Sequence, residues 1–239
     1  MGAGMSGDEL IAAAKRVILR RQEAISNNLA NASTAGFKGE HVFARVLAGA
    51  TAGDGLVAES QTDLRPGALE STGRPLDLAL EGPGFFVVET SAGDRLTRGG
   101  SFTLAADGTI IDAHGNALLG DGGRVRVPPG APMGRVAVDG AGNVRVDGRL
   151  LGRLRVERTP DDAVLERQGS GLFVPPATRV PDRDAAGVRQ GALEASNVNI
   201  LDGLVELVLI QRAYGALHQV DAIAESVEGR AIELGKPAT

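Results

Sequence analysis

The sequence predicts an α+β protein in which a helix at each end of the chain accompanies a central antiparallel β-rich domain. Three observations support this class. Apolar residues recur at helical spacing before residue 36 and again after residue 196. Between residues 76 and 156, short apolar runs alternate with Asp-Gly and Gly-Asn pairs, which favour hairpin turns. Prolines interrupt both stretches that connect these parts.

The N-terminal helix is predicted from a start signal, a periodic stripe and a stop signal. Ser6 and Glu9 form a capping box, and Gly36 is a plausible end. Its apolar positions follow helical spacing: Leu10, Ile11, Ala14, Val17, Ile18, Ile25 and Leu29.

The C-terminal helix is predicted to start at a cap at Ser196 or Asn199 and to end near Leu234, before Gly235 and Pro237. Its apolar stripe changes face along the helix, running through Leu201, Leu204, Val205 and Val208 and then Tyr214, Leu217, Val220, Ile223, Ala224 and Val227. A helix that is apolar on several faces needs partners on several sides. We therefore expect neighbouring subunits to cover it.

Expected strands lie at 76–80, 85–88, 95–104, 136–138, 144–146 and 154–156. The predicted organisation is a pair of helices forming one discontinuous, coiled-coil-like polymerising core, with arms leading to the β-rich outer domain. Its segments are the N-terminal helix at 1–36, an extended arm at 37–75, the β-rich domain at 76–156, a connecting arm at 157–195 and the C-terminal helix at 196–239.

Composition argues against several classes of function. The net charge of −5 gives no footprint for nucleic acid or an anionic membrane surface. The absence of cysteine excludes disulfides and thiol catalysis. His41, His114 and His218 lie far apart without further ligands at metal spacing. We expect no catalytic residue, metal, cofactor or small-molecule substrate, no membrane-inserted segment and no classical cleaved export signal.

Three segments of the sequence, called the signature segments below, carry distinctive motifs. Residues 25–38 read ISNNLANASTAGFK. Residues 67–102 contain GAL, LDLAL, GPGFF and TRGGSF. Residues 191–214 contain GALE, SNVN and QRAY. Together these segments resemble the flagellar rod and hook family, and residues 25–38 are similar to the family's N-terminal pattern. The order and the placement of these motifs near both ends of the chain make the resemblance specific.

The resemblance implies a structural subunit of the bacterial flagellar basal-body rod, spanning the periplasm. Such a subunit assembles through its terminal helices with its own copies and other rod proteins, transmits torque, and is exported by the flagellar type III apparatus. The length and Leu151-Gly152-Arg153-Leu154 favour a proximal rod protein; QRAY at 211–214 is typical of the distal one, and a hook-type axial subunit is a further alternative. A β-rich surface adhesin or carbohydrate-binding module is the rival from another class.

The predicted subunit interface follows from the helical stripes and the signature segments. Asn27, Asn28 and Asn31 stand where apolar residues are commoner, so hydrogen bonds that fix the register between subunits are one interpretation and a solvated helix face is the other. The full set is Ile18, Ile25, Asn27, Asn28, Leu29, Asn31, Phe37, Asn197, Asn199, Leu204, Val208, Gln211, Arg212 and Tyr214.

Overall fold

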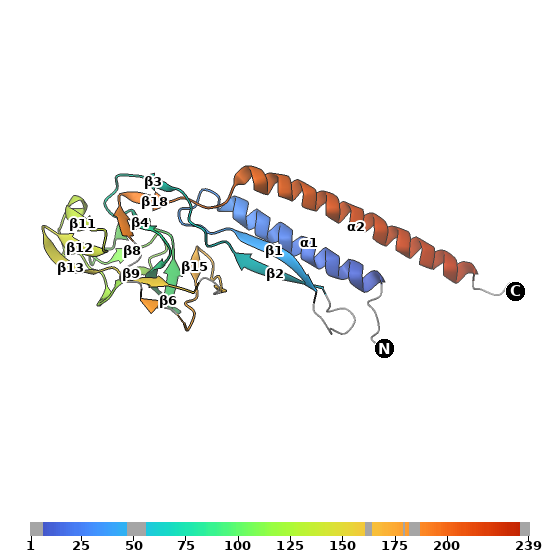
Figure 1. Cartoon of the computed structure of the whole chain (residues 1–239), viewed down its shortest axis with the longest axis horizontal. Helices are drawn as coiled ribbons and strands as arrows, with labels where there is room; N and C mark the ends of the chain where they lie inside the picture. The colour runs from blue at the N-terminus through green and yellow to red at the C-terminus, as the bar shows by residue number, and fades with distance from the viewer. Residues whose placement is uncertain (1–6, 47–55, 161–163, 179, 182–186, 235–239) are drawn as a thin grey trace. The chain divides into compact units, whose positions relative to one another are not determined.

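The computed structural model describes residues 7–46, 56–160, 164–178, 180–181 and 187–234. The chain divides into two compact units. The helical unit comprises residues 1–30, 40–61 and 199–239, and the β unit comprises residues 31–39 and 62–198. Figure 1 shows the helices and strands of both. The predicted α+β class is confirmed.

In the helical unit, helix α1 (Gly7–Ala30) packs against helix α2 (Ile200–Leu234) and against the two-stranded sheet of β1 (Glu40–Val46) and β2 (Leu56–Thr62). Figure 1 shows α1 and α2 side by side. Gly203 permits a close approach, because a Cβ atom there would lie 2.8 Å from Leu29 Cδ2. The buried side chains between these elements include Ala13, Val17, Ala24, Ile25, Val42 and Ile210.

The described part of the β unit contains one large antiparallel sheet and three small ones. In the large sheet the strands run in the order β15-β6-β5-β9-β8-β7, β10 joins β9, and β14 pairs with both β5 and β16. Its strands are β5 (Phe85–Thr90), β6 (Gly93–Thr97), β7 (Thr103–Leu104), β8 (Ile110–Ile111), β9 (Ala117–Gly120), β10 (Gly123–Arg124), β14 (Val156–Arg158), β15 (Leu172–Phe173) and β16 (Val180–Pro181).

The small sheets bring distant parts of the chain together. Strands β11 (Val136–Val138), β12 (Asn143–Val146) and β13 (Arg149–Arg153) form a meander that follows a short 3-10 helix at Met133–Arg135. Strand β4 (Leu78–Glu81) pairs with β17 (Gly187–Gln190), and β3 (Leu69–Ser71) pairs with β18 (Ala192–Glu194). Because β17 and β18 come from late in the sequence, these pairs fasten the returning chain to the β unit.

Two cores hold the β unit together. The larger is aliphatic with two phenylalanines, including Leu78, Leu80, Phe86, Phe102 and Leu118. Phe86 and Phe102 meet edge to face, with ring centroids 5.8 Å apart. The smaller core includes Phe85, Val87, Leu96, Leu119, Leu165 and Phe173. Strand β5 contributes to both, because successive side chains on a strand point to opposite faces.

The structure differs from the sequence-based boundaries in several places. The strand expected at 95–104 is two strands, β6 and β7, which residues 98–102 separate. Helix α1 ends at Ala30 rather than Gly36, because residues 31–36 form turns in which the Thr34 amide donates to the Asn31 carbonyl at 3.0 Å. The arm at 37–75 contains β1, β2 and β3, and the arm at 157–195 contains most of β14 and all of β15 to β18. Short, polar strands that pair with distant partners leave little local pattern to detect. Ser6, Gly235 and Pro237 lie outside the described residues.

A buried charge cluster of signature residues

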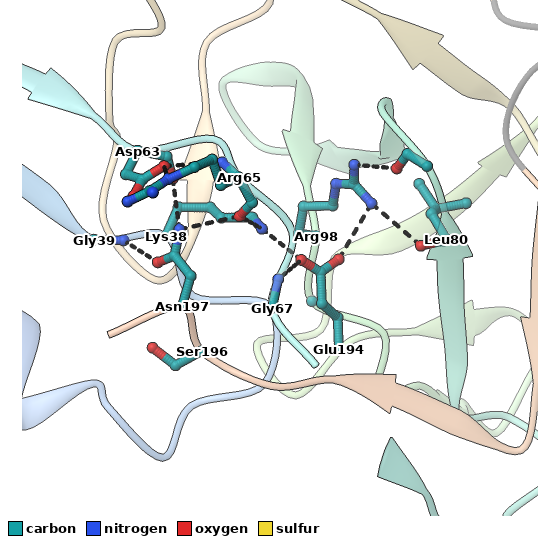
Figure 2. Close-up of polar contacts among 12 residues, drawn as sticks. Lys38, Gly39, Asp63, Arg65, Gly67, Leu80, Arg98, Glu194, Ser196 and Asn197 are labelled. Atoms are coloured by element: carbon teal, nitrogen blue, oxygen red, sulfur yellow. Dashed lines mark hydrogen bonds and ion pairs between the residues drawn. The ribbon is translucent and has the colours of Figure 1, made fainter. Parts of the chain in front are cut away.

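One residue from each signature segment meets the others inside the β unit. The Lys38 ammonium forms an ion pair with Glu194 Oε1, and Arg98 Nη1 lies 3.2 Å from Glu194 Oε2. The side chains of Lys38 and Glu194 are 0% exposed and that of Arg98 is 3% exposed. Figure 2 shows the two cations approaching the Glu194 carboxylate from two sides. We call these three residues the charge cluster.

Backbone groups complete the hydrogen bonding of the cluster. Lys38 Nζ donates to the Arg65 carbonyl at 2.7 Å, and Glu194 Oε1 accepts from the Gly67 amide at 2.9 Å. Arg98 Nη2 donates to the Gly82 carbonyl at 2.5 Å. Only the Arg98 Nε atom, within this set, is buried without a hydrogen-bond partner. The cluster therefore ties five stretches of backbone to one point.

The cluster holds two cations against one carboxylate. Burial lowers the pKa of Lys38 below its usual value, while the hydrogen bond and the charge of Glu194 act in the opposite direction. Burial also lowers the pKa of the Arg98 guanidinium, again opposed by Glu194. The desolvation of both cations makes Glu194 the group on which the cluster depends.

Three signature glycines allow the backbones around the cluster to touch. Gly36 has φ of 69°, and a Cβ atom there would lie 2.2 Å from the Arg98 carbonyl carbon. A Cβ at Gly67 would lie 2.0 Å from the Ala195 carbonyl oxygen, and one at Gly100 would lie 1.7 Å from the Leu78 carbonyl oxygen. No side chain fits at such distances, so all three positions need glycine for packing, and Gly36 also needs it for its positive φ.

Asn197 extends the hydrogen-bond network beside the cluster. Its Oδ1 accepts from the Gly39 amide at 2.7 Å, and its Nδ2 donates to the carbonyls of Asp63 at 2.8 Å and Arg65 at 3.1 Å. Figure 2 shows Asn197 next to Lys38. Asn197 of the SNVN motif thus forms hydrogen bonds with backbone groups of Gly39, Asp63 and Arg65.

Arg167 comes from the connecting arm, outside the signature segments, and closes the same region. Its guanidinium carbon lies 5.1 Å from the ring centroid of Phe37 and 5.4 Å from that of Phe173. It also donates to the Lys38 carbonyl and, at 3.1 Å, to Thr62 Oγ1. Phe37 is thereby held on the β unit.

In the helical unit, Asn28 forms a local clamp. Its Nδ2 donates to the Glu40 carbonyl at 2.8 Å, and its Oδ1 accepts from the Glu40 amide at 2.9 Å. Both groups of this buried side chain are therefore used within the chain, where they fix the start of β1 against α1. At the start of α2, Asn199 Oδ1 caps the helix by accepting from the Leu201 amide at 3.0 Å.

The predicted interface residues fall into three groups by exposure. Exposed residues are Asn27, Asn199, Leu204, Val208, Gln211 and Arg212. Partly buried residues are Ile18, Leu29, Asn31, Asn197 and Tyr214. Buried residues are Ile25, Asn28 and Phe37. Their role between subunits stays a prediction, and the exposed group is the one that lies at the surface of this chain.

The cluster offers no nucleophile paired with a base, and its charged groups are already paired with one another. Among the described residues, no group of three or more His, Asp or Glu side chains is placed to hold a metal ion. None of the helices in the described ranges is both long and apolar enough to cross a membrane. The arrangement fastens chain segments, which is a structural task.

Known proteins share this arrangement of segments. Residues 79–146 match the model of the flagellar hook protein FlgE/F/G D1 domain. Residues 19–38 match the model of flagella basal body rod proteins, and residues 189–233 match that of the flagellar basal body rod FlgEFG protein C-terminal region. These matches include Lys38, Arg98 and Glu194, one in each.

Curated relatives extend the similarity over most of the chain. The flagellar basal-body rod protein FlgF of Caulobacter vibrioides is 33% identical, over 93% of this chain and 95% of that protein. The chain belongs to the flagellar basal-body rod protein family. FlgF of Salmonella typhimurium is 30% identical over 90% of this chain and 92% of its own length. FlgG of Bacillus subtilis is 28% identical over 86% of this chain and 89% of its own length.

Membership confirms the family and its location in the flagellar basal body, as the signature segments predicted. Proteins of this family are structural components of the rod, in keeping with a cluster that fastens chain segments. The family match also separates this chain from the adhesin class considered above.

Proposed function

We propose that this rod protein enters the rod through its terminal helices, by contacts with its own copies and with other rod proteins, and that the resulting tube carries torque. The observation that carries the proposal is the apolar surface of α2. Leu201, Val205 and Leu209 are 72%, 61% and 58% exposed. Their spacing of four residues places them on one face of the helix.

This apolar surface is wider than one stripe. Leu204 and Val208 are exposed beside the first row, and Val220, Ile223 and Val227 are exposed further along α2. Covering one such side chain fully is worth about 1.5–3 kcal/mol, so several together can support a stable interface. Contiguous exposed apolar surface of this kind marks an interaction site.

The ion pairs between the two helices show which side of α2 is already occupied within the chain. Within the helical unit, α1 and α2 are joined by the ion pairs Lys15–Asp221 and Arg21–Glu206, the latter at 4.0 Å. These pairs lie on the side of α2 that faces α1. The exposed row at Leu201 and Val205 is left for a different helix, one from a neighbouring subunit.

A charge placed in the apolar row tests the proposal. We expect Val205→Asp to prevent incorporation into basal bodies and to abolish motility, because the carboxylate would be desolvated in the interface. His218→Asp adds the same charge at an exposed polar position on a different face of α2 from Val205 and Ile223, and should leave assembly unchanged. The NMR spectrum of the β unit should be the same in both variants.

Two results would count against the proposal. Wild-type incorporation of Val205→Asp would show that this face of α2 stays in water within the rod. Equal loss of assembly in His218→Asp would show that α2 tolerates no added charge on either face, and the assigned face would lose its support.

Within the rod we place this chain in the proximal segment. Its length of 239 residues and the Leu151-Gly152-Arg153-Leu154 segment support that choice over the distal segment. We further propose delivery by the flagellar type III export apparatus. Immunogold labelling of purified basal bodies should mark the membrane-proximal part of the rod, and label at the hook-proximal end would contradict the placement.

A further inference from the structure

A small pocket opens beside the charge cluster in the β unit. Its volume is about 230 Å³, and its inner wall includes Arg98 and Phe85, whose ring centroid lies 5.5 Å from the Arg98 guanidinium carbon. The described lining residues are Leu64, Arg65, Pro83, Gly84, Phe85, Arg98, Arg158, Thr159 and Pro160. They include three guanidinium groups and no carboxylate. The pocket is thus a concentrated source of positive charge.

Among the described residues, the carboxylates nearby do not balance these cations. Glu194 is shared between Arg98 and Lys38. Asp63 is engaged by Arg65, at 2.6 Å between Oδ2 and Nη2. Lys38, Arg98 and Arg65 therefore carry three positive charges against two negative ones, and Arg158 adds a fourth positive charge.

Glu157, the acidic residue next to Arg158 in the sequence, does not neutralise the positive charge of Arg158. Glu157 lies next to Arg158 in β14, and successive side chains of a strand point to opposite faces. Glu157 pairs instead with Arg155, two residues earlier, at 2.5 Å. Arg158 is exposed at the mouth of the pocket, while Thr159 beside it is buried.

We propose that this pocket receives a carboxylate side chain, Asp or Glu, from a second copy of this chain. Guanidinium groups bind carboxylates through paired, charge-assisted hydrogen bonds. The volume suits one side chain rather than a strand or helix, and the apolar walls of Leu64, Pro83 and Phe85 would exclude water from the pair. The buried Arg98 Nε atom has no hydrogen-bond partner, so this wall retains one unused donor.

The proposal rests on assembly of this chain into the rod, because only assembly brings a second copy to the β unit. The chain supplies suitable groups, with 30 Asp and Glu residues and a net charge of −5. A basic pocket on an acidic chain favours contact between unlike surfaces of two copies, which is the arrangement that extends a tube rather than closing a dimer.

Binding can be tested on the full-length monomer by NMR of the arginine Nε–Hε groups. The probe is N-acetyl-aspartate N-methylamide, titrated at constant ionic strength against sodium chloride. We expect saturable shifts of Arg98 and Arg158, and binding about tenfold weaker in Arg158→Gln. Arg149→Gln, an exposed arginine of β13 that does not line the pocket, should bind as the wild type. Small linear shifts shared by all arginines would overturn the proposal.

The source of the carboxylate is tested separately. If the probe binds only after Asp161→Asn and Asp162→Asn, the chain fills its own pocket and the assignment to a second copy is overturned. In assembled rods, a photo-crosslinker at Pro160, an exposed lining residue, should yield dimers joined through an acidic segment, whereas only intramolecular products would contradict the proposal.

Assembly in cells distinguishes this inference from the function on which it rests. Arg158→Glu should reduce motility while Arg149→Glu does not, with both variants retaining the β-unit NMR spectrum. Equal motility of the two variants would overturn the pocket assignment and leave assembly through α2 intact. Normal assembly of the Val205→Asp variant would instead contradict the proposed interface on α2.

Discussion

Replacing Glu194 should destabilise the β unit more than replacing Lys38, although the two residues share an ion pair. Glu194→Gln leaves Lys38 and Arg98 buried without a carboxylate, and stranding a buried charge costs about 3–5 kcal/mol. Lys38→Met removes one of two cations and leaves the Arg98–Glu194 pair at 3.2 Å. It forfeits the hydrogen bonds of Lys38 to Glu194 and to the Arg65 carbonyl, about 1–3 kcal/mol.

The expected difference is therefore about 2 kcal/mol, or a shift of roughly 1 M in the urea midpoint. Urea titration of the full chain, followed by NMR of the core methyl groups of Val87 and Leu96, reports on the β unit alone. Glu89→Gln is the matched control, because Glu89 pairs with Arg124 on the exposed surface and should contribute little. A urea midpoint of Lys38→Met at or below that of Glu194→Gln would refute the argument that Glu194 compensates two buried cations.

Three further predictions concern the same units. Gly36→Ala should cost more than about 1 kcal/mol in urea unfolding, because Gly36 has positive φ and touches the Arg98 backbone; an unchanged midpoint would contradict that contact. Since burial lowers the pKa of Lys38 below 10.5, the unfolded chain binds more protons in the alkaline range below that value. In that pH range the stability of the wild type relative to Lys38→Met should accordingly rise with pH, and a stability difference that falls with pH would contradict the prediction. Gly203→Leu should separate α1 from α2, seen as shifted Leu29 methyl signals with those of the β unit unchanged.

The elements that the sequence predicted best have strong local signals. Helix α2 was predicted to reach Leu234 and is helical from Ile200 to that residue, the last one described, because its long apolar periodicity needs no distant partner to be recognised. The strands around Phe85–Thr90 and Val136–Val138 were found from apolar runs between turn pairs. Strand β18 was missed, because its three residues are defined by pairing with Leu69–Ser71 far earlier in the chain.

The site was only half visible in the sequence. Lys38, Arg98 and Glu194 stood inside the signature segments, yet nothing local shows that residues so far apart form one buried cluster. A charged residue in a motif rich in glycine and apolar residues was the available signal. The sequence around Arg167 carried no such signal, because the role of Arg167 depends on Phe37 and Phe173 lying close together in the folded chain.

Asn28 shows a different limit of pattern reading. An asparagine among apolar helix positions fitted hydrogen bonding between subunits, but the structure supplies both partners from Glu40 of the same chain. Spacing identified a side chain with a specific hydrogen-bonding role. The spacing could not identify the backbone groups that bind the Asn28 side chain, because their position depends on the turn between residues 31 and 39.

The most direct test of assembly through α2 is side-chain footprinting by carbene labelling, compared between the free monomer and purified basal bodies. Labelling of Leu201, Val205 and Leu209 is measured by mass spectrometry and normalised to the unfolded chain. Coverage by a neighbouring subunit predicts high labelling in the monomer, where these side chains are more than half exposed, and a severalfold decrease in the rod. Equal labelling in both states would contradict the proposed assembly.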